Sequence, residues 1–139
     1  MKPSAKTLYA CQALVELAQQ YPSRRPVLIE DIARRHNIPL KFLQQILLSL
    51  KAAGLVESRR GPEGGYLLAR PPGQITLYEI VTPLDPPSPP KRSNPLPNSQ
   101  WSALPVWREI DETVKVILES YTLEKILLLS QGPQGMYYI

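Results

Sequence analysis

The chain has 139 residues, of which 43% are hydrophobic, so its length favours one compact domain with an appendage and its composition supports a real core. The formal net charge of +4 is uneven, because residues 1–70 carry 11 Lys/Arg against 5 Asp/Glu while residues 71–139 carry 5 against 7, which makes the basic half the candidate for contact with an acidic partner. One cysteine excludes an internal disulfide. The sequence has no run of about 18 apolar residues and no signal-peptide core, which predicts a cytoplasmic protein without a membrane span.

A first helix is predicted from Ser4 to about Gln20. Its apolar residues recur at helical spacing: Leu8, Cys11, Leu14, Val15 and Ala18. The residues between them are polar and are expected to face solvent: Lys6, Gln12, Glu16 and Gln19. The helix should end before the segment 21–26, because two prolines in six residues prevent its continuation.

Two further helices follow with a tight turn between them. The shorter runs from about Ile29 to His36, and Asn37 tolerates the left-handed conformation that ends a helix. Pro39 suits the first position of the next helix, which spans about 40–53 and stops at Gly54. Its apolar face is predicted from spacings of three and four: Leu43, Ile46, Leu47 and Leu50. The opposite face carries Lys41, Gln44, Gln45, Leu48 and Ser49.

Two short strands, 55–59 and 66–70, are predicted after the third helix. The sequence Gly-Pro-Glu-Gly-Gly at 61–65 lies between them and supplies the permissive backbone of a reversal. The order of three helices and a hairpin predicts a mainly α fold with a small β-hairpin wing, a winged helix-turn-helix domain.

The second half of the chain is predicted to begin with a short helix and a linker. Thr76 and Glu79 form a capping box on a helix that runs to about Thr82. The segment 83–105 holds 8 of the 16 prolines, so it should be an extended linker. We therefore divide the chain into a winged domain at 1–82, a linker at 83–104, and a long helix with a C-terminal tail at 105–139.

The long helix carries a narrow apolar stripe at intervals of three and four: Trp107, Ile110, Val114, Ile117 and Tyr121. On a tethered helix such a stripe needs a partner surface, and the same helix from a second chain would supply one. The alternative is that the helix folds back on its own domain, where the first helix also has apolar surface to cover. We expect a contribution from both.

Few residues suit catalysis, and the sequence disfavours an enzyme. His36 is the one histidine and lies at a helix end, where a cationic or surface role is common. Cys11 lies at core spacing and is expected to be a small buried hydrophobe. The acidic pairs at 30–31 and 111–112 are adjacent residues on helices, so their side chains point apart and are expected to lie on solvated faces. The loop at 61–65 lacks the lysine and the strand–helix context of a phosphate-binding loop.

Nucleic-acid binding is better supported. Lys41, Gln44 and Gln45 occupy the first turns of the third helix, which a helix-turn-helix places in the major groove. Arg59 and Arg60 approach the hairpin tip, where a guanidinium can enter a narrow minor groove. Lys2 and Lys6 would add phosphate contacts. Polar residues on an exposed helix are common, so the order and spacing of these residues carry the hypothesis.

Several motifs together resemble the Rrf-type family of bacterial regulators, whose members are IscR-, NsrR- and CymR-like. They are S-x-K-x-x-Y-A-x-x-A-L at 4–14, Ile32-Ala33 to Ile38-Pro39, residues 41–47, Gly54-Leu55-Val56, and above all R-G-P-E-G-G-Y-L-L-A-R at 60–70. The match is close over residues 1–82 and looser near Trp107 and Thr122.

The resemblance implies a homodimer whose long C-terminal helices cross and place two winged domains on a palindromic operator. It assigns the major groove to Lys41, Gln44 and Gln45, and the minor groove to Arg60 and Gly61. It also adds Phe42, Gly64 and Gly65 to the DNA-binding set. Glu is common in the family where Gln44 stands here, and Leu48 and Ser49 replace residues that are commonly polar or basic, so base preference is expected to differ.

The sensor region departs from the cluster-binding members of the family, which have three cysteines before the dimerisation helix. This chain has neither Cys nor His at 83–139, and thiolates, with occasional histidine, hold iron–sulfur clusters. A ligand from Cys11 would require a different site between subunits. The resemblance is therefore to the cluster-free branch, regulated by a small molecule, a partner protein or the protein's own abundance.

The sequence thus predicts a dimeric DNA-binding regulator, a repressor, without cofactor or metal. The alternative is a winged-helix module that docks a partner protein through the linker or the C-terminal helix.

Overall fold

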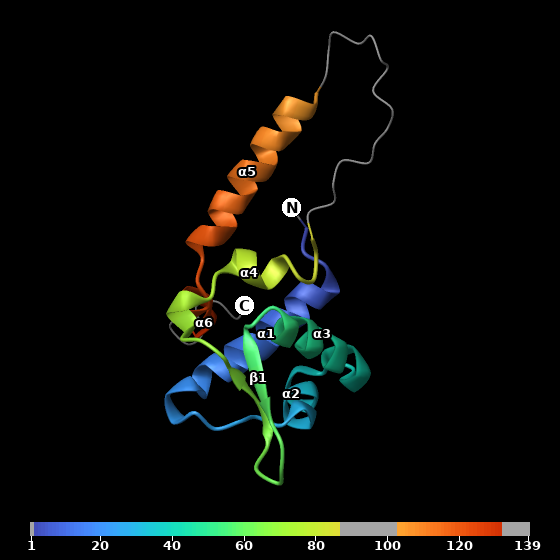
Figure 1. The fold of residues 1–139 in the computed structure, drawn as a ribbon, viewed down its shortest axis with the longest axis vertical. Helices are drawn as coiled ribbons and strands as arrows, with labels where there is room; N and C mark the ends of the chain where they lie inside the picture. Colours follow the sequence, from blue (N-terminus) through green and yellow to red (C-terminus); the bar gives the residue numbers. More distant parts are fainter. Residues whose placement is uncertain (1, 87–102, 132–139) are drawn as a thin grey trace.

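The computed structural model describes residues 2–86 and 103–131. It is mostly helical with one two-stranded antiparallel hairpin (Figure 1), which confirms the predicted fold class. The elements in chain order are α1 (Ala5–Gln19), η1 (Tyr21–Ser23), α2 (Ile29–His36), α3 (Leu40–Ala52), β1 (Val56–Arg59), β2 (Gly65–Leu68), η2 (Pro72–Gln74), α4 (Leu77–Val81), α5 (Leu104–Ser120) and α6 (Leu123–Gln131). No helix in the described ranges has the length and apolar character needed to cross a bilayer.

Helix α1 is the central element of the core, but its buried face differs from the predicted one. Ser4 caps the helix, its hydroxyl accepting from the Thr7 amide at 3.3 Å. The buried side chains include Ala10, Ala13, Leu14, Leu17 and Ala18. Leu8 is 52% exposed, and Cys11 and Val15 are only half-buried. Glu16, expected in solvent, is buried. The face is shifted because α2, α3 and α6 pack around α1 from several sides.

Helices α2 and α3 form the predicted helix-turn-helix. Asn37 adopts the left-handed conformation (φ 53°, ψ 47°), and the Ile38 amide donates to the Ala33 carbonyl at 2.9 Å, which ends α2. Pro39 is the N-cap of α3 and lies one residue before the position predicted for it. All four apolar residues predicted for the inner face of α3 are buried.

The wing is a hairpin with a third chain segment beside it. Val56 pairs with Leu68 and Arg59 with Gly65 in an antiparallel register. The segment at Val27 adds two backbone hydrogen bonds of 2.8 Å to Tyr66, so the hairpin is attached to the loop before α2. This attachment was not apparent from the strand pattern, because a single bridge has no periodicity.

The C-terminal part of the chain returns to the winged domain. Thr76 and Glu79 form the predicted capping box on α4. Thr76 also pairs with Thr122, and the Leu123 amide donates to the Ile75 carbonyl at 2.8 Å. Leu123 is 0% exposed, and α6 packs against α1. This region was predicted to be a C-terminal tail, so α6 was not expected from the sequence.

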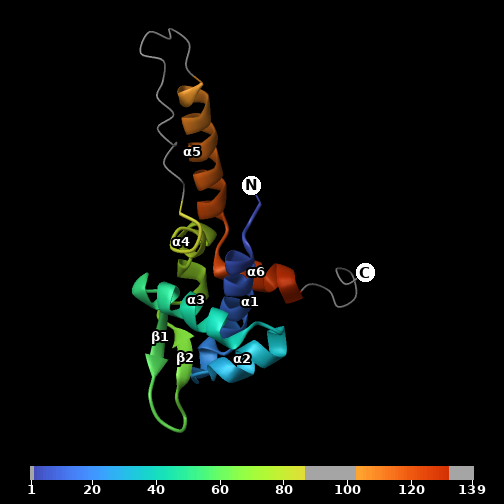
Figure 2. The same ribbon diagram turned by 90° about the vertical axis from the view of Figure 1, so that its right-hand side faces the viewer.

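Helix α5 extends from the domain at the end opposite the wing tip, as Figures 1 and 2 show. It packs along α4 and buries none of its residues. Trp107 and Ile110 are 59% and 42% exposed. Tyr121 is not on this helix, because α5 ends at Ser120 and Tyr121 has an extended backbone. Of the predicted linker, residues 87–102 lie outside the described part of the chain.

Candidate nucleic-acid interface

The outward face of α3 presents the residues predicted to read bases. Lys41, Gln44 and Gln45 are all exposed, and they alternate with the leucines and isoleucine that anchor the helix in the core. Because residues three and four apart share one face of a helix, these side chains point in a common direction. Because the buried face of α3 fixes the rotation of the helix, it also determines which hydrogen-bonding side chains the helix presents to solvent.

The wing presents the predicted arginines. Arg59 ends β1, Arg60 follows it, and both are exposed. The turn beyond them closes with a hydrogen bond of 2.9 Å from the Gly64 amide to the Gly61 carbonyl. Gly61 has φ +105°, a conformation that L side chains rarely adopt. The two guanidinium groups are thus held at the base of a tight, protruding turn.

Gly64 and Gly65 are needed for space and have no side chain to offer. A Cβ at Gly64 would lie 2.3 Å from the Arg59 carbonyl oxygen, and one at Gly65 would lie 2.4 Å from that of Val27. Gly64 is also buried. The structure therefore explains these predicted site residues as requirements for the shape of the wing.

A side-chain contact joins the helix to the wing. The Lys51 ammonium donates to the Ser58 hydroxyl at 2.7 Å, linking the end of α3 to β1. Both groups are exposed, so the contribution to stability is small. The contact nevertheless bridges the two elements that carry the candidate DNA contacts. Sequence reasoning missed this pair, which no motif marks.

Phe42 is a packing residue. It is half-buried, and its ring meets the Tyr9 ring edge-on with centroids 5.6 Å apart, an arrangement that stabilises aromatic pairs. Lys6, Phe42 and Gln45 also line a small hollow of about 100 Å³ beside Leu84. The structure thus places Lys6 near the first turns of α3, and Lys2 is exposed in the N-terminal segment.

A hydrogen-bonded clasp, formed by Ser4, Thr7 and Asp85, holds the start of α1. One carboxylate oxygen of Asp85 accepts from the Ser4 hydroxyl at 2.6 Å, the Thr7 hydroxyl at 2.5 Å and the Ser4 amide at 3.3 Å. These bonds, first from Ser4 and then from Thr7, lower the pKa of Asp85 below its ordinary value. The partners are 78 and 81 residues apart, so spacing could not have indicated the clasp.

A second buried contact supports the helix-turn-helix from below. The Glu16 carboxylate accepts from the Arg35 guanidinium at 2.5 Å, and its other oxygen lies 3.4 Å from Nε2 of His36. The hydrogen bond that Arg35 donates to Glu16 raises the pKa of Arg35 above its ordinary value. These contacts tie the last turn of α2 to α1, immediately before the Asn37 turn.

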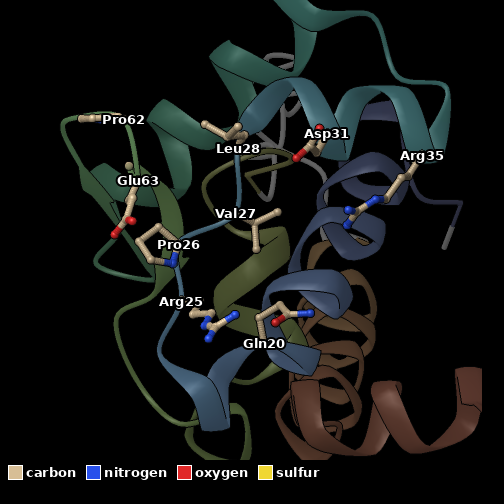
Figure 3. A pocket seen from close by; sticks show the side chains of 10 residues that line it. Gln20, Arg25, Pro26, Val27, Leu28, Asp31, Arg35, Pro62 and Glu63 are labelled. Atoms are coloured by element: carbon tan, nitrogen blue, oxygen red, sulfur yellow. The ribbon is translucent and has the colours of Figure 1, made fainter.

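A cleft of about 590 Å³ lies between the wing tip and α2 (Figure 3). Pro62 and Glu63 form one side, and Asp31 and Arg35 lie across from them. Its lining carries both signs of charge and includes no residue of α3. The cleft is therefore separate from the outward face of α3, and its mixed charges produce no single-sign field that would attract a phosphate.

A groove beside α1 and α6 is lined by the one cysteine and the one histidine of the sequence. Cys11 and His36 line it together with Ile126 and Gln131. Burial raises the pKa of the Cys11 thiol to about 11, so it is not ionised at neutral pH and is a poor ligand or nucleophile. Across residues 2–86 and 103–131, no three His, Cys, Asp or Glu side chains gather in a way that could hold a metal ion.

Comparison with known proteins identifies the family. The family model "Rrf2: Iron-dependent Transcriptional regulator" matches residues 3–128. The HTH-type transcriptional regulator CymR of Bacillus subtilis is 34% identical over 137 residues, covering 99% of this chain and 97% of that protein.

Solved structures agree with the sequence relatives. IscR of T. potens has a TM-score of 0.77 at 32% identity, covering 100% of this chain and 97% of that one. The structure titled as CymR, the global cysteine regulator of B. subtilis, has a TM-score of 0.76 at 33% identity, covering 96% and 99%. These proteins are regulators and not enzymes, as the sequence predicted. This chain therefore belongs to the Rrf2 family and is a DNA-binding transcriptional regulator with a winged helix-turn-helix fold.

Proposed function

We propose that the chain acts in the bacterial cytoplasm as a homodimeric repressor that binds a palindromic operator. In each half-site, α3 enters the major groove and the wing enters the adjacent minor groove. The observation that carries this proposal is that the wing and α5 extend from opposite ends of the domain that contains α3 (Figure 2), and that α5 buries none of its residues. A dimer formed through α5 would present two copies of the reading surface to one duplex.

The reading surface is suited to two grooves at once. Lys41, Gln44 and Gln45 offer donors that match base edges or phosphates in the major groove. Arg59 and Arg60 lie at the protruding wing, where the electronegative minor groove attracts guanidinium groups. The Lys51–Ser58 hydrogen bond supports a constant separation between the two sets.

The dimer is supported by the apolar surface that α5 leaves in solvent. Val106, Trp107, Ile110 and Ile117 are exposed on a helix that buries none of its residues. A groove of about 450 Å³ runs between α4 and α5, and its lining includes Val81, Ile110, Val114 and Leu118. Soluble monomers rarely expose such contiguous patches, and a two-fold arrangement would let each copy cover the other.

Iron does not fit this chain in the way the family description suggests. Cluster binding requires several thiolates, and the whole sequence contains one cysteine and one histidine. The one thiol is protonated at neutral pH because burial raises its pKa. We propose regulation by a small molecule, a partner protein or the protein's own abundance. The protein-docking module is not favoured, since the relatives are HTH-type transcriptional regulators.

The decisive experiment is selection of DNA from a random library by the full-length chain, followed by titration of the enriched duplex. Arg60→Ala should weaken binding by about tenfold or more, from the loss of a desolvated contact. Lys125→Ala on α6 removes the same charge elsewhere and should leave affinity unchanged. Affinity should fall steeply with salt as counterions are released. Full affinity in Arg60→Ala, or salt-independent binding, would contradict the proposal.

The dimer is tested separately by analytical ultracentrifugation. Ile110→Asp places a charge in the apolar stripe of α5 and should shift the protein to monomers with near-native circular dichroism. Glu109→Asp, on the same helix and also exposed, is the control. A wild-type monomer at concentrations that saturate the operator would exclude the homodimer.

A further inference from the structure

Leu48 is an exception on α3. The other leucines in the middle of this helix, Leu43, Leu47 and Leu50, are all 0% exposed, whereas Leu48 is 59% exposed. The core therefore makes little use of this side chain. An exposed leucine alone has no special meaning, so its surroundings decide whether it has a role.

The neighbours of Leu48 are the candidate base-reading residues. Gln44 precedes it by four positions and Gln45 by three, which places all three side chains on one strip of the helix surface. Lys41 continues the strip one turn nearer the N-terminus. Leu48 is thus an apolar group among one lysine and two glutamines on a strip that points away from the core. A partner surface that complements this strip must offer hydrogen-bonding groups with an apolar group among them.

The major groove of DNA has this chemistry. Its edges present hydrogen-bond donors and acceptors, and its apolar group is the C5-methyl of thymine. Glutamine is well matched to adenine, whose N6 and N7 atoms can bond both ends of one amide. Each adenine pairs with a thymine, so the methyl lies beside the edge that a glutamine would read.

We propose that Leu48 packs against the 5-methyl group of a thymine in each half-site and, with Gln44 or Gln45, selects an A·T pair there. The inference rests on the proposed function, because it requires α3 in the major groove. Leu48 is then a specificity-determining residue, and the lysine and two glutamines around it favour DNA as its occupant over an apolar protein surface.

The test removes one methyl group at a time. In the operator selected by the wild-type chain, each thymine of both half-sites is replaced in turn by deoxyuridine, which differs only in lacking the 5-methyl. At one symmetric position the loss should be about fourfold per half-site, the equivalent of about 0.8 kcal/mol for one buried methyl. In Leu48→Ala the same replacement should have no effect, since the contacting side chain is gone.

The controls separate this inference from the proposed function. Leu48→Ala should fold normally, because the residue is exposed and alanine favours helices. Leu128→Ala, at a similarly exposed leucine of α6, should keep the discrimination of the wild type. The role of Leu48 alone would be overturned by either of two results. The first is an enriched operator whose affinity does not fall at any deoxyuridine replacement. The second is a preference for thymine over deoxyuridine that persists in Leu48→Ala. Failure to enrich any sequence would overturn the proposed function and this inference together.

Discussion

At the scale of single residues, the backbone around position 65 leaves no room for any side chain larger than that of glycine. The φ of Gly65 is +145°, and a Cβ would lie 2.4 Å from the carbonyl oxygen of Val27. Its backbone is paired with Arg59 at the end of the hairpin. A glycine here lets the loop before α2 approach the wing closely enough for the two hydrogen bonds between Val27 and Tyr66.

Gly65→Ala is therefore expected to destabilise the protein by about 1–3 kcal/mol, from backbone strain and the displaced Val27 segment. Denaturant unfolding gives the change in free energy. Gly73→Ala is the matched control, since its Cβ would meet only the end of the flexible Glu124 side chain. A loss of stability at Gly73 as large as that at Gly65 would contradict the explanation.

Glu16 is a buried carboxylate whose effect on stability depends on the guanidinium group that pairs with it. Arg35→Ala leaves the buried carboxylate without its guanidinium donor and should lower the denaturation midpoint. Glu16→Met removes the charge and fills the space, and such replacements are often neutral or stabilising. We expect Arg35→Ala to unfold at lower denaturant than Glu16→Met. The reverse order would show that leaving Glu16 without its guanidinium donor costs less than replacing it, which contradicts the explanation.

At the scale of elements, the clasp of Asp85 with Ser4 and Thr7 joins the N-terminus of α1 to the segment after α4. It holds Lys6 near α3, beside Phe42 and Gln45. The Arg70–Glu79 contact similarly joins the segment after the wing to α4. Burial alone would raise the pKa of Glu79, but the hydrogen bonds from Arg70 and Thr76 lower it below its ordinary value.

The lowered pKa of Asp85 predicts the pH dependence of the clasp. A carboxyl group whose pKa falls on folding stabilises the protein above its unfolded pKa, about 3.9, and this contribution is lost as pH falls through the folded value. Asp85→Asn should therefore be less stable than the wild type at pH 7, and the difference should shrink below about pH 4. Unfolding at a series of pH values measures it. Glu119→Gln, at an exposed position of α5, should show no comparable narrowing.

At the scale of the whole molecule, the winged domain and the C-terminal region share one core. Leu123 lies far along the chain but belongs to the same buried cluster as Leu14 and Ile75. The strand-like pairing of residues 121–123 with 75–77 attaches the C-terminal end of α5 to the domain. A dimer built on α5 would thereby set the spacing of its two reading surfaces.

Leu123→Ala should cost about 2–5 kcal/mol, the range for deleting a fully buried leucine side chain. Leu128→Ala removes the same atoms from an exposed position of α6 and should change stability by no more than about 0.5 kcal/mol. Equal effects of the two substitutions on the denaturation midpoint would show that α6 is not part of the cooperative core.

The sequence by itself determined the features that arise from local interactions. The bounds of α2, the left-handed Asn37, the buried face of α3 and the capping box of α4 follow from helical periodicity and from side chains that bond nearby backbone. The positions of Lys41, Gln44 and Gln45 on the open face of α3 follow from the same periodicity. The glycine-rich wing was predictable because its conformation restricts the residues that fit.

Only the tertiary structure decided which surfaces are covered. Leu8 is exposed and Glu16 buried because the neighbours of α1 come from distant parts of the chain, which helical spacing does not describe. The Asp85 clasp, the Val27 bridge and the packing of α6 on α1 are likewise long-range contacts. Helical spacing predicted that Leu48 lies on the outward face of α3 with the glutamines, and the assembled fold added that the side chain stays 59% exposed.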